Sequence, residues 1–90
     1  MIVKEINHIV HGCPSRWDGK LDDGRTFYIK YRWGYLSVHV SNEVTDDLMA
    51  PLNDGVEVMG VQIDPSGWDG VMSGDEMIKI VSEVFKFEES

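Results

Sequence analysis

The stretch Arg25 to Val40, RTFYIKYRWGYLSVHV, carries the pattern that decides the fold. Its apolar residues alternate with polar ones, and they change parity at the dipeptide Trp33-Gly34. They are Phe27, Ile29 and Tyr31 before the dipeptide, and Leu36, Val38 and Val40 after it. Alternation with a period of two is typical of a half-buried strand, and a tight hairpin produces such a change of parity. The stretch therefore predicts two antiparallel strands.

A two-residue loop at Trp33-Gly34 places all the apolar pairs of this hairpin on one face. The predicted pairs are Arg32 with Tyr35, Tyr31 with Leu36, Ile29 with Val38, and Phe27 with Val40. A tryptophan is unusual at the first position of such a turn, which favours Asn or Asp. We infer either that Trp33 is retained for a contact or that the loop has four residues, which preserves the same register.

The opposite face of the hairpin gives the sharpest functional hypothesis. Cations and aromatic rings together are what a nucleotide-like ligand needs, because cations hold phosphate and rings stack on a base. The expected ligand-binding residues are Tyr28, Lys30, Arg32, Trp33, Tyr35 and His39. The alternative is an ordinary solvated sheet face, since antiparallel sheets commonly leave one side in water.

The residues before the hairpin predict two more strands. The apolar residues of 2–11 fit both helical and strand spacing, and their richness in β-branched side chains favours a strand. Ser15 to Leu21 forms a short strand that leads into the turn Asp22-Asp23-Gly24. A two-residue loop at this turn places Trp17 on the outer face. A three-residue loop, with Gly24 in a bulge, places Trp17 opposite Ile29 in the core. The sequence leaves both registers open.

The second half of the chain predicts one strand between two helical segments. Thr45 is a candidate cap for a helical turn that Pro51 limits in length. Val56 to Ile63 is a strand in which Gly60 suggests a bulge or a close backbone approach, and Glu57 breaks the apolar pattern.

The C-terminal segment predicts an amphipathic helix from about Gly74 to Lys86. Ser73 and Glu76 form a capping box at its start. We therefore expect an α+β fold, in which an antiparallel β-meander of four to five strands carries one C-terminal helix on its apolar face. The 90 residues form a single domain, residues 1–90.

Charge and composition exclude several classes of function. Residues 1–40 have a net charge of +2 and residues 41–90 a net charge of −10, so a chain of net charge −8 is repelled by nucleic-acid backbones. No apolar run has the length of a membrane span, and the N-terminus lacks the pattern of a signal peptide. The single cysteine, Cys13, is compatible with a reducing compartment. We expect a cytoplasmic protein that binds neither nucleic acid nor membranes directly.

Other residues of interest give weaker signals. Trp68, in a loop rich in Gly and Asp, and Trp17 are candidate anchors for a protein partner, or else parts of the core. His8, His11 and Cys13 resemble zinc ligands, but a structural site needs four ligands and the sequence offers no second pair. No oxyanion segment or orienting carboxylate accompanies Cys13. We expect no metal, no cofactor and no enzymatic activity.

Three strings resemble those of short uncharacterised phage and prophage proteins: residues 13–17 (CPSRW), 23–25 (DGR) and 31–38 (YRWGYLSV). The resemblance covers roughly the first 40 residues. It implies a binding protein that counters host defence from the host cytoplasm. The leading hypothesis is capture of a small anionic, nucleotide-like ligand, with a pocket shared across a homodimer or higher homo-oligomer. The second is an acidic inhibitor that presents residues 41–90, anchored by Trp68, to a host protein.

Overall fold

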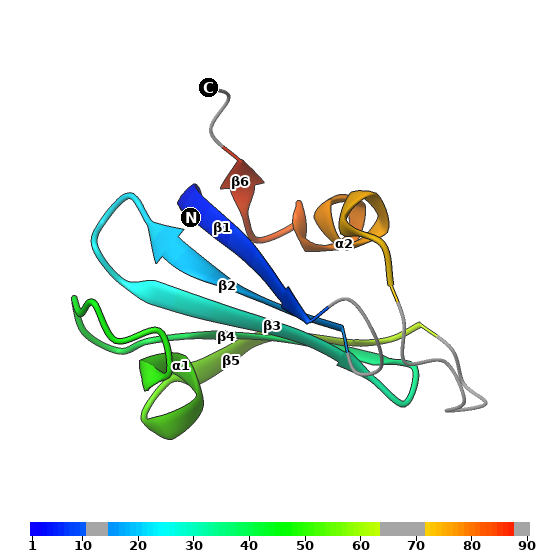
Figure 1. The fold of residues 1–90 in the computed structure, drawn as a ribbon, viewed down its shortest axis with the longest axis horizontal. Coiled ribbons are helices and arrows are strands. Elements are labelled where there is room, and N and C mark those ends of the chain that lie inside the picture. Colours follow the sequence, from blue (N-terminus) through cyan, green and yellow to red (C-terminus); the bar gives the residue numbers. More distant parts are fainter. Residues whose placement is uncertain (11–14, 64–71, 88–90) are drawn as a thin grey trace.

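The computed structural model describes residues 1–10, 15–63 and 72–87 and is dominated by one curled β-sheet (Figure 1). Its elements are β1 (Ile2–Val10), β2 (Ser15–Leu21), β3 (Thr26–Arg32), β4 (Tyr35–Val40), α1 (Ala50–Asn53), β5 (Val56–Gln62), α2 (Gly74–Val81) and β6 (Lys86–Phe87). The strand order is β5-β4-β3-β2-β1-β6. Strands β1 to β5 form an antiparallel meander, and β6 pairs with β1 in parallel. The α+β class is confirmed, with six strands in the described part of the chain rather than four to five.

The central hairpin has the register predicted from its alternation. Arg32 pairs with Tyr35 and Ile29 with Val38, so the loop consists of Trp33 and Gly34 alone. Both loop residues have positive φ, 57° for Trp33 and 74° for Gly34. This is the conformation of a type I′ turn, whose twist matches that of the flanking strands. Trp33 therefore adopts a backbone conformation that bulky residues rarely take.

Strand β2 adopts the second of the two possible registers. Trp17 pairs with Ile29, and the loop before β3 holds Asp22, Asp23 and Gly24, the last with φ of 92°. Trp17 is only 2% exposed and belongs to the hydrophobic core. The hypothesis that Trp17 is a surface contact for a partner is therefore wrong, because the bulged loop turns this side chain to the face that the protein buries.

The core lies between one face of the sheet and the C-terminal segment. Met77, Val81 and Phe85 are at most 1% exposed, and Phe85 meets Phe27 in an edge-to-face contact with ring centroids 4.9 Å apart. The side chain of Ser73 caps α2 by accepting a hydrogen bond from the Glu76 N–H, as predicted.

Helix α2 ends at Val81, five residues earlier than the sequence suggested. Ser82 begins a turn, and its hydroxyl donates to the Lys79 carbonyl at 2.7 Å. The Lys86 N–H then donates to the Met1 carbonyl, so the chain leaves the helix and pairs as β6 along β1. The prediction of helix to Lys86 is wrong because the edge of β1 offers backbone partners that an isolated periodicity argument does not contain.

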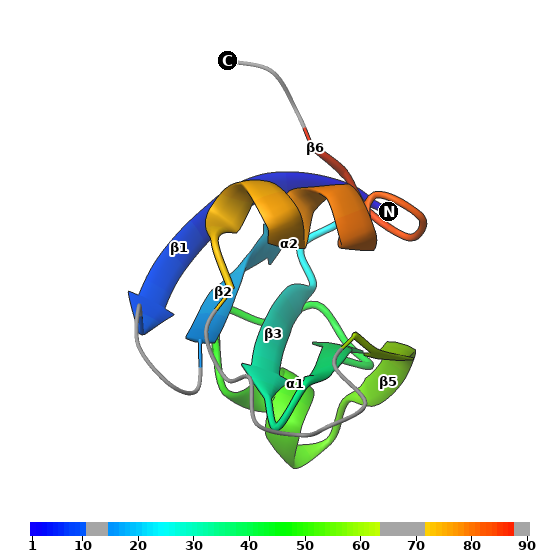
Figure 2. The same ribbon diagram turned by 90° about the vertical axis from the view of Figure 1, so that its right-hand side faces the viewer.

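The segment between β4 and β5 covers part of the other face of the sheet. Figures 1 and 2 show α1 and α2 on opposite sides of β3, and α1 contacts β3 and β4. Thr45 does not cap α1: the helix begins after Met49 without a side-chain cap, while the Thr45 hydroxyl accepts from the Asp47 N–H in a local turn. Pro51 lies in the first turn of α1, where a missing N–H is tolerated.

Strand β5 contains an irregularity that changes which face its first residues occupy. Val38 pairs with Met59, but His39 pairs with Glu57, so Val58 is an extra residue in the ladder. The bulge lies at Val58 and not at Gly60, where the sequence suggested it. One extra residue moves the preceding side chain to the opposite face, which explains why Glu57 departs from the apolar alternation.

Candidate functional site

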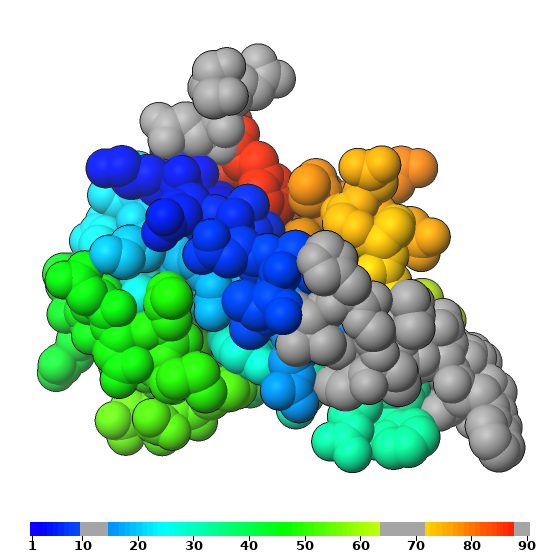
Figure 3. All heavy atoms as spheres, viewed as in Figure 1, coloured from blue at the N-terminus to red at the C-terminus, as the bar shows by residue number. Residues whose placement is uncertain are grey.

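The polar face of the hairpin forms a shallow groove of about 520 Å³. For convenience we call it the hairpin groove. Its walls come from β3, β4 and β5 and from the turn that joins β3 to β4, which protrudes at the lower right border in Figure 3. The residues that line it are Lys30, Arg32, Trp33, Tyr35, Ser37, His39, Glu57 and Gln62. Five of the six side chains predicted to bind a ligand are therefore brought together in one surface depression.

The cationic end of the groove lies beside the turn. Lys30 and Arg32 follow each other on the same side of β3, because alternate residues of a strand share a face. The Arg32 guanidinium lies over the Trp33 ring, 5.2 Å from its centroid. Trp33 is 59% exposed, so this cation–π contact leaves ring surface accessible to a ligand.

Tyr35 and Glu57 meet above a glycine at the β5 side of the groove. A Cβ atom at Gly60 would lie 1.9 Å from the Tyr35 hydroxyl and 3.4 Å from a Glu57 carboxylate oxygen. The Tyr35 ring therefore crosses from β4 over Gly60 of β5, and only a residue without a side chain leaves room for it.

Glu57 and Gln62 are groove residues that the sequence reasoning did not identify as functional. Glu57 interrupts the apolar alternation of its strand, which could have drawn attention to it. The alternation alone does not show on which face of the sheet the Glu57 side chain lies once the strand contains a bulge. Glu57 places a carboxylate in a groove that also holds two cations, so the groove has a positive end and a negative end.

His39 lies at the negative end, beside Glu57. It pairs across the sheet with Tyr28 on one side and Glu57 on the other. Its Nδ1 atom is buried and has no hydrogen-bond partner in the described part of the chain. A buried imidazole nitrogen without a partner favours a ligand that brings a donor or an acceptor to it.

Tyr28 is separated from the other predicted ligand residues. It lies on the same face but is only 3% exposed, and it does not line the groove. The segment from residue 41 to 54 covers this part of the face, as the contacts of α1 with β3 show. The prediction that Tyr28 binds the ligand directly is corrected: its ring is buried as part of the protein.

Of the remaining candidates, Trp17 lies in the core, His8 is half-buried beside it, and the others lie outside the described residues. The ring of His8 stacks on that of Trp17 with centroids 4.6 Å apart. His11, Cys13 and Trp68 lie outside the described ranges. Within those ranges, no group of three His, Cys, Asp or Glu residues is arranged to hold a metal ion. Likewise, none of the described helices has the length and apolar character required to cross a bilayer.

A second depression, of about 350 Å³, lies beside α1. It is lined by Ser41, Asn42, Glu43, Thr45, Asp47, Ala50 and Asp54. Its ionisable lining is entirely acidic, so it repels anions and differs in character from the hairpin groove.

Comparisons with known protein families, with curated proteins and with solved structures found no match to this chain.

Proposed function

We propose that the hairpin groove binds a small phosphorylated ligand of the nucleotide type and that the protein acts by capturing it. The observation that carries the proposal is the arrangement of the groove. Two cations, two exposed aromatic rings and an imidazole lie in one depression of a protein whose net charge is −8. A chain of this charge has no need of cations on that surface for solubility.

The cations and the rings have different roles in this proposal. Arg32 and Lys30 contact the phosphate, because charge-assisted hydrogen bonds to an anion are stronger than neutral ones. Trp33 and Tyr35, 59% and 38% exposed, offer ring faces for stacking with a base.

The negative end of the groove selects the rest of the ligand. Glu57 accepts hydrogen bonds only, so it suits a hydroxyl pair or an amino group and repels a second phosphate. His39, which pairs with Glu57 across the sheet, offers a further polar atom beside it. A ligand with phosphate at one end and sugar hydroxyls or an exocyclic amine at the other matches this polarity.

The resemblance of the first 40 residues to phage proteins gives the proposal its biological setting. A phage protein that sequesters a nucleotide signal in the host cytoplasm lowers the free concentration of that signal without catalysis. We propose this role, counteracting a host defence, for the hairpin groove.

Calorimetric titration with inorganic phosphate and with nucleoside mono-, di- and triphosphates tests the ligand class. The double variant Lys30→Ala with Arg32→Ala should weaken binding at least about 100-fold, since each charge-assisted hydrogen bond contributes about 1.5–3 kcal/mol. The control is Lys4→Ala with Lys79→Ala, which removes two exposed cations away from the groove. Equal losses in both double variants, or no binding by the unmodified protein, would exclude the proposal.

A second candidate function rests on a different surface. The segment after β4 exposes Val44, Met49 and Leu52, by 73%, 48% and 40%. Carboxylates surround them along the same segment: Glu43, Asp46, Asp47 and Asp54. Apolar side chains with a charged rim are typical of protein interfaces, and this rim suits a basic host protein that the chain would inhibit.

One pair of variants separates the two functions. Val44→Ser with Met49→Ser should abolish inhibition of a host protein and leave nucleotide binding unchanged. The Lys30→Ala and Arg32→Ala pair should have the opposite effect. Salt adds a further distinction, because a broad charged interface loses more affinity at high ionic strength than a small groove.

A further inference from the structure

Strand β5 forms one border of the sheet among the described residues (Figure 2). The Ile63 N–H donates to the Gly34 carbonyl at 2.7 Å, on the side where β4 lies. Alternate residues of a strand turn their backbone groups to opposite sides. The N–H and C=O of Gly60, three residues earlier, therefore point away from β4 and toward the outside of the sheet.

From Met59 onward, after the bulge at Val58, this border lacks the features that usually keep an exposed strand from pairing. β5, VEVMGVQ, contains no Lys, Arg or Pro, and Glu57 is its one charged residue. Protected edges carry such residues or a bulge, are very short, or are covered by another element. In β5 the bulge and the charge of Glu57 both lie before Met59 and leave the rest of the strand regular. Val56 is 54% exposed at one end of the strand, and Ile63 is 38% exposed just beyond the other end. The border is an apolar template for another strand.

We propose that a second copy of this chain adds its β5 to this border in antiparallel orientation, with a two-fold axis at Gly60. In this register Gly60 faces the partner's Gly60, and their outward backbone groups bond to each other. Met59 then lies opposite the partner's Val61, on the core face. Such an interface is self-complementary, as closed two-fold symmetry requires.

A second copy is favoured over another extended peptide because the border continues the hairpin groove. Tyr35 and Glu57 both reach over Gly60, so one end of the groove lies at the proposed axis. Symmetry brings the partner's Tyr35 and the partner's Glu57 to the same place. The two shallow grooves then join into one longer site, to which each copy contributes cations at its outer end.

The pairing of β5 with β5 does not depend on the proposed ligand. Only the use of the joined groove as one binding site rests on the proposed function. The two proposals can therefore be tested separately. The molecular mass in solution tests the pairing of β5 with β5, and titration with nucleotides tests the joined groove as a binding site.

Analytical ultracentrifugation of the full chain without ligand tests the pairing. The unmodified protein should sediment with twice the mass of its 10.2 kDa chain. Gly60→Glu adds two carboxylates at the axis, where the two Glu57 side chains already lie, and displaces only the end of the Tyr35 side chain, so it should sediment as a monomer. Val56→Glu adds the same charge to the same strand away from the axis and should remain a dimer. A monomeric unmodified protein, or equal dissociation of the two variants, overturns the proposal.

Hydrogen exchange of the unmodified protein gives a test that needs no substitution. Dilution below the dissociation constant should speed the exchange of the Gly60 amide by about tenfold or more, while the Val61 amide, which faces β4, keeps its protection. If Gly60 and Val61 respond equally to dilution, β5 is not the interface. Loss of nucleotide binding in a protein that remains dimeric would contradict the proposed function alone.

Discussion

The outer face of strands β3 and β4 has two halves. Both follow from the same alternation of side chains, but one half is buried and the other is exposed to solvent. At one end Tyr28 is 3% exposed, and at the other Tyr35 is 38% exposed. Both are tyrosines on the same side of the same hairpin. The difference shows that alternation assigns a side chain to a face, whereas a covering segment decides whether that side chain meets solvent.

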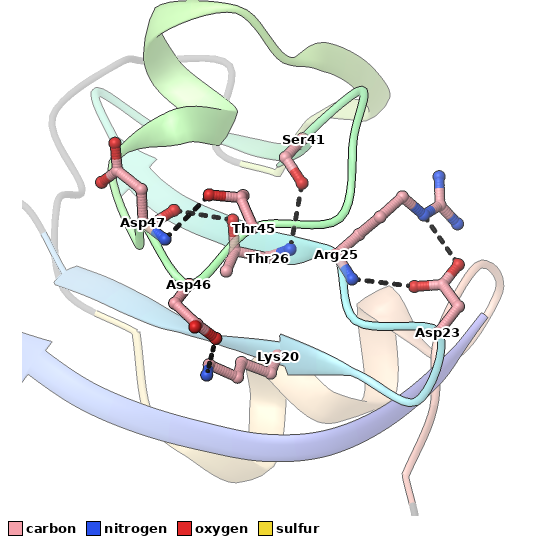
Figure 4. Close-up of polar contacts among 8 residues, drawn as sticks. All are labelled: Lys20, Asp23, Arg25, Thr26, Ser41, Thr45, Asp46 and Asp47. Atoms are coloured by element: carbon pink, nitrogen blue, oxygen red, sulfur yellow. Dashed lines mark hydrogen bonds and ion pairs between the residues drawn. The ribbon is translucent and has the colours of Figure 1, made fainter.

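The covered half is held by a network of hydrogen bonds from the segment after β4 (Figure 4). The Thr26 N–H donates to the Ser41 hydroxyl at 3.0 Å, and the Thr26 hydroxyl donates to the Asp47 carbonyl at 2.9 Å. Lys20 extends from β2 to the Asp46 carboxylate at 2.6 Å. These contacts hold residues 41–47 over one half of the face and leave the half near Trp33 open.

The largest expected effect is the difference in the free energy of unfolding between variants of the two tyrosines. Tyr28→Ala should lower the free energy of unfolding by about 3 kcal/mol, since it removes a buried ring. Tyr35→Ala should lower it by less than about 1 kcal/mol, because its ring lies over a groove. Urea denaturation measures both. Similar losses would mean that the two halves are equally packed.

The next effect concerns the network that holds the cover. Ser41→Ala removes the acceptor of the buried Thr26 N–H and should cost about 2 kcal/mol. Ser37→Ala, in β4, is the matched control: Ser37 is buried like Ser41, at 5% and 3% exposed, but it lines the groove instead of holding the cover, so the change should cost less than about 1 kcal/mol. The same denaturation experiment serves for both variants. The network is not what holds the segment if Ser37→Ala proves as costly.

A smaller effect of opposite sign is expected at the turn. Trp33 has φ of 57°, so Trp33→Asn should relieve backbone strain and raise the free energy of unfolding by about 0.5–1 kcal/mol, net of the lost contact with Arg32. The same variant should weaken ligand binding. A loss of stability would show that Trp33 packs more tightly than its exposure indicates.

The smallest effect is the pH dependence of the pair that links β2 to the cover. The hydrogen bond and charge of Lys20 lower the pKa of the Asp46 carboxyl below its usual 3.8. A lowered carboxyl pKa contributes stability above the unfolded value, which is lost as pH falls through the folded one. Asp46→Asn should therefore lower Tm slightly at neutral pH and not at all at strongly acid pH. Thermal melts across this range, repeated in high salt, measure the difference, and a pH-independent change in Tm would contradict it.

Much of the fold followed from local patterns. The parity of Ile29 and Val38 was enough to predict the hairpin register. The capping residues Ser73 and Glu76 were enough to predict the start of α2. Both are decided by residues near each other in sequence, so no distant segment enters the argument. Five of the six predicted ligand residues line one groove for the same reason, since alternation put them on one face.

The error at Thr45 is local, but the errors that change the site and the sheet involve contacts between distant segments. Lys86 left the predicted helix for the edge of β1, and Tyr28 was buried by the segment after β4. Glu57 joined the groove because Val58 is an extra residue relative to β4. None of these outcomes is encoded in the periodicity of the strand or helix concerned, because each depends on which neighbour offers backbone partners or covers a surface.

The sequence by itself determined that apolar side chains gather under the central hairpin and cations and rings above it, because a strand turns successive side chains to opposite faces. Only the tertiary structure decided how much of the upper side stays open, that a carboxylate from β5 joins it, and that β5 ends the described sheet. Those outcomes depend on the docking of residues 41–47 and on the bulge at Val58, which arise when segments far apart in the chain meet.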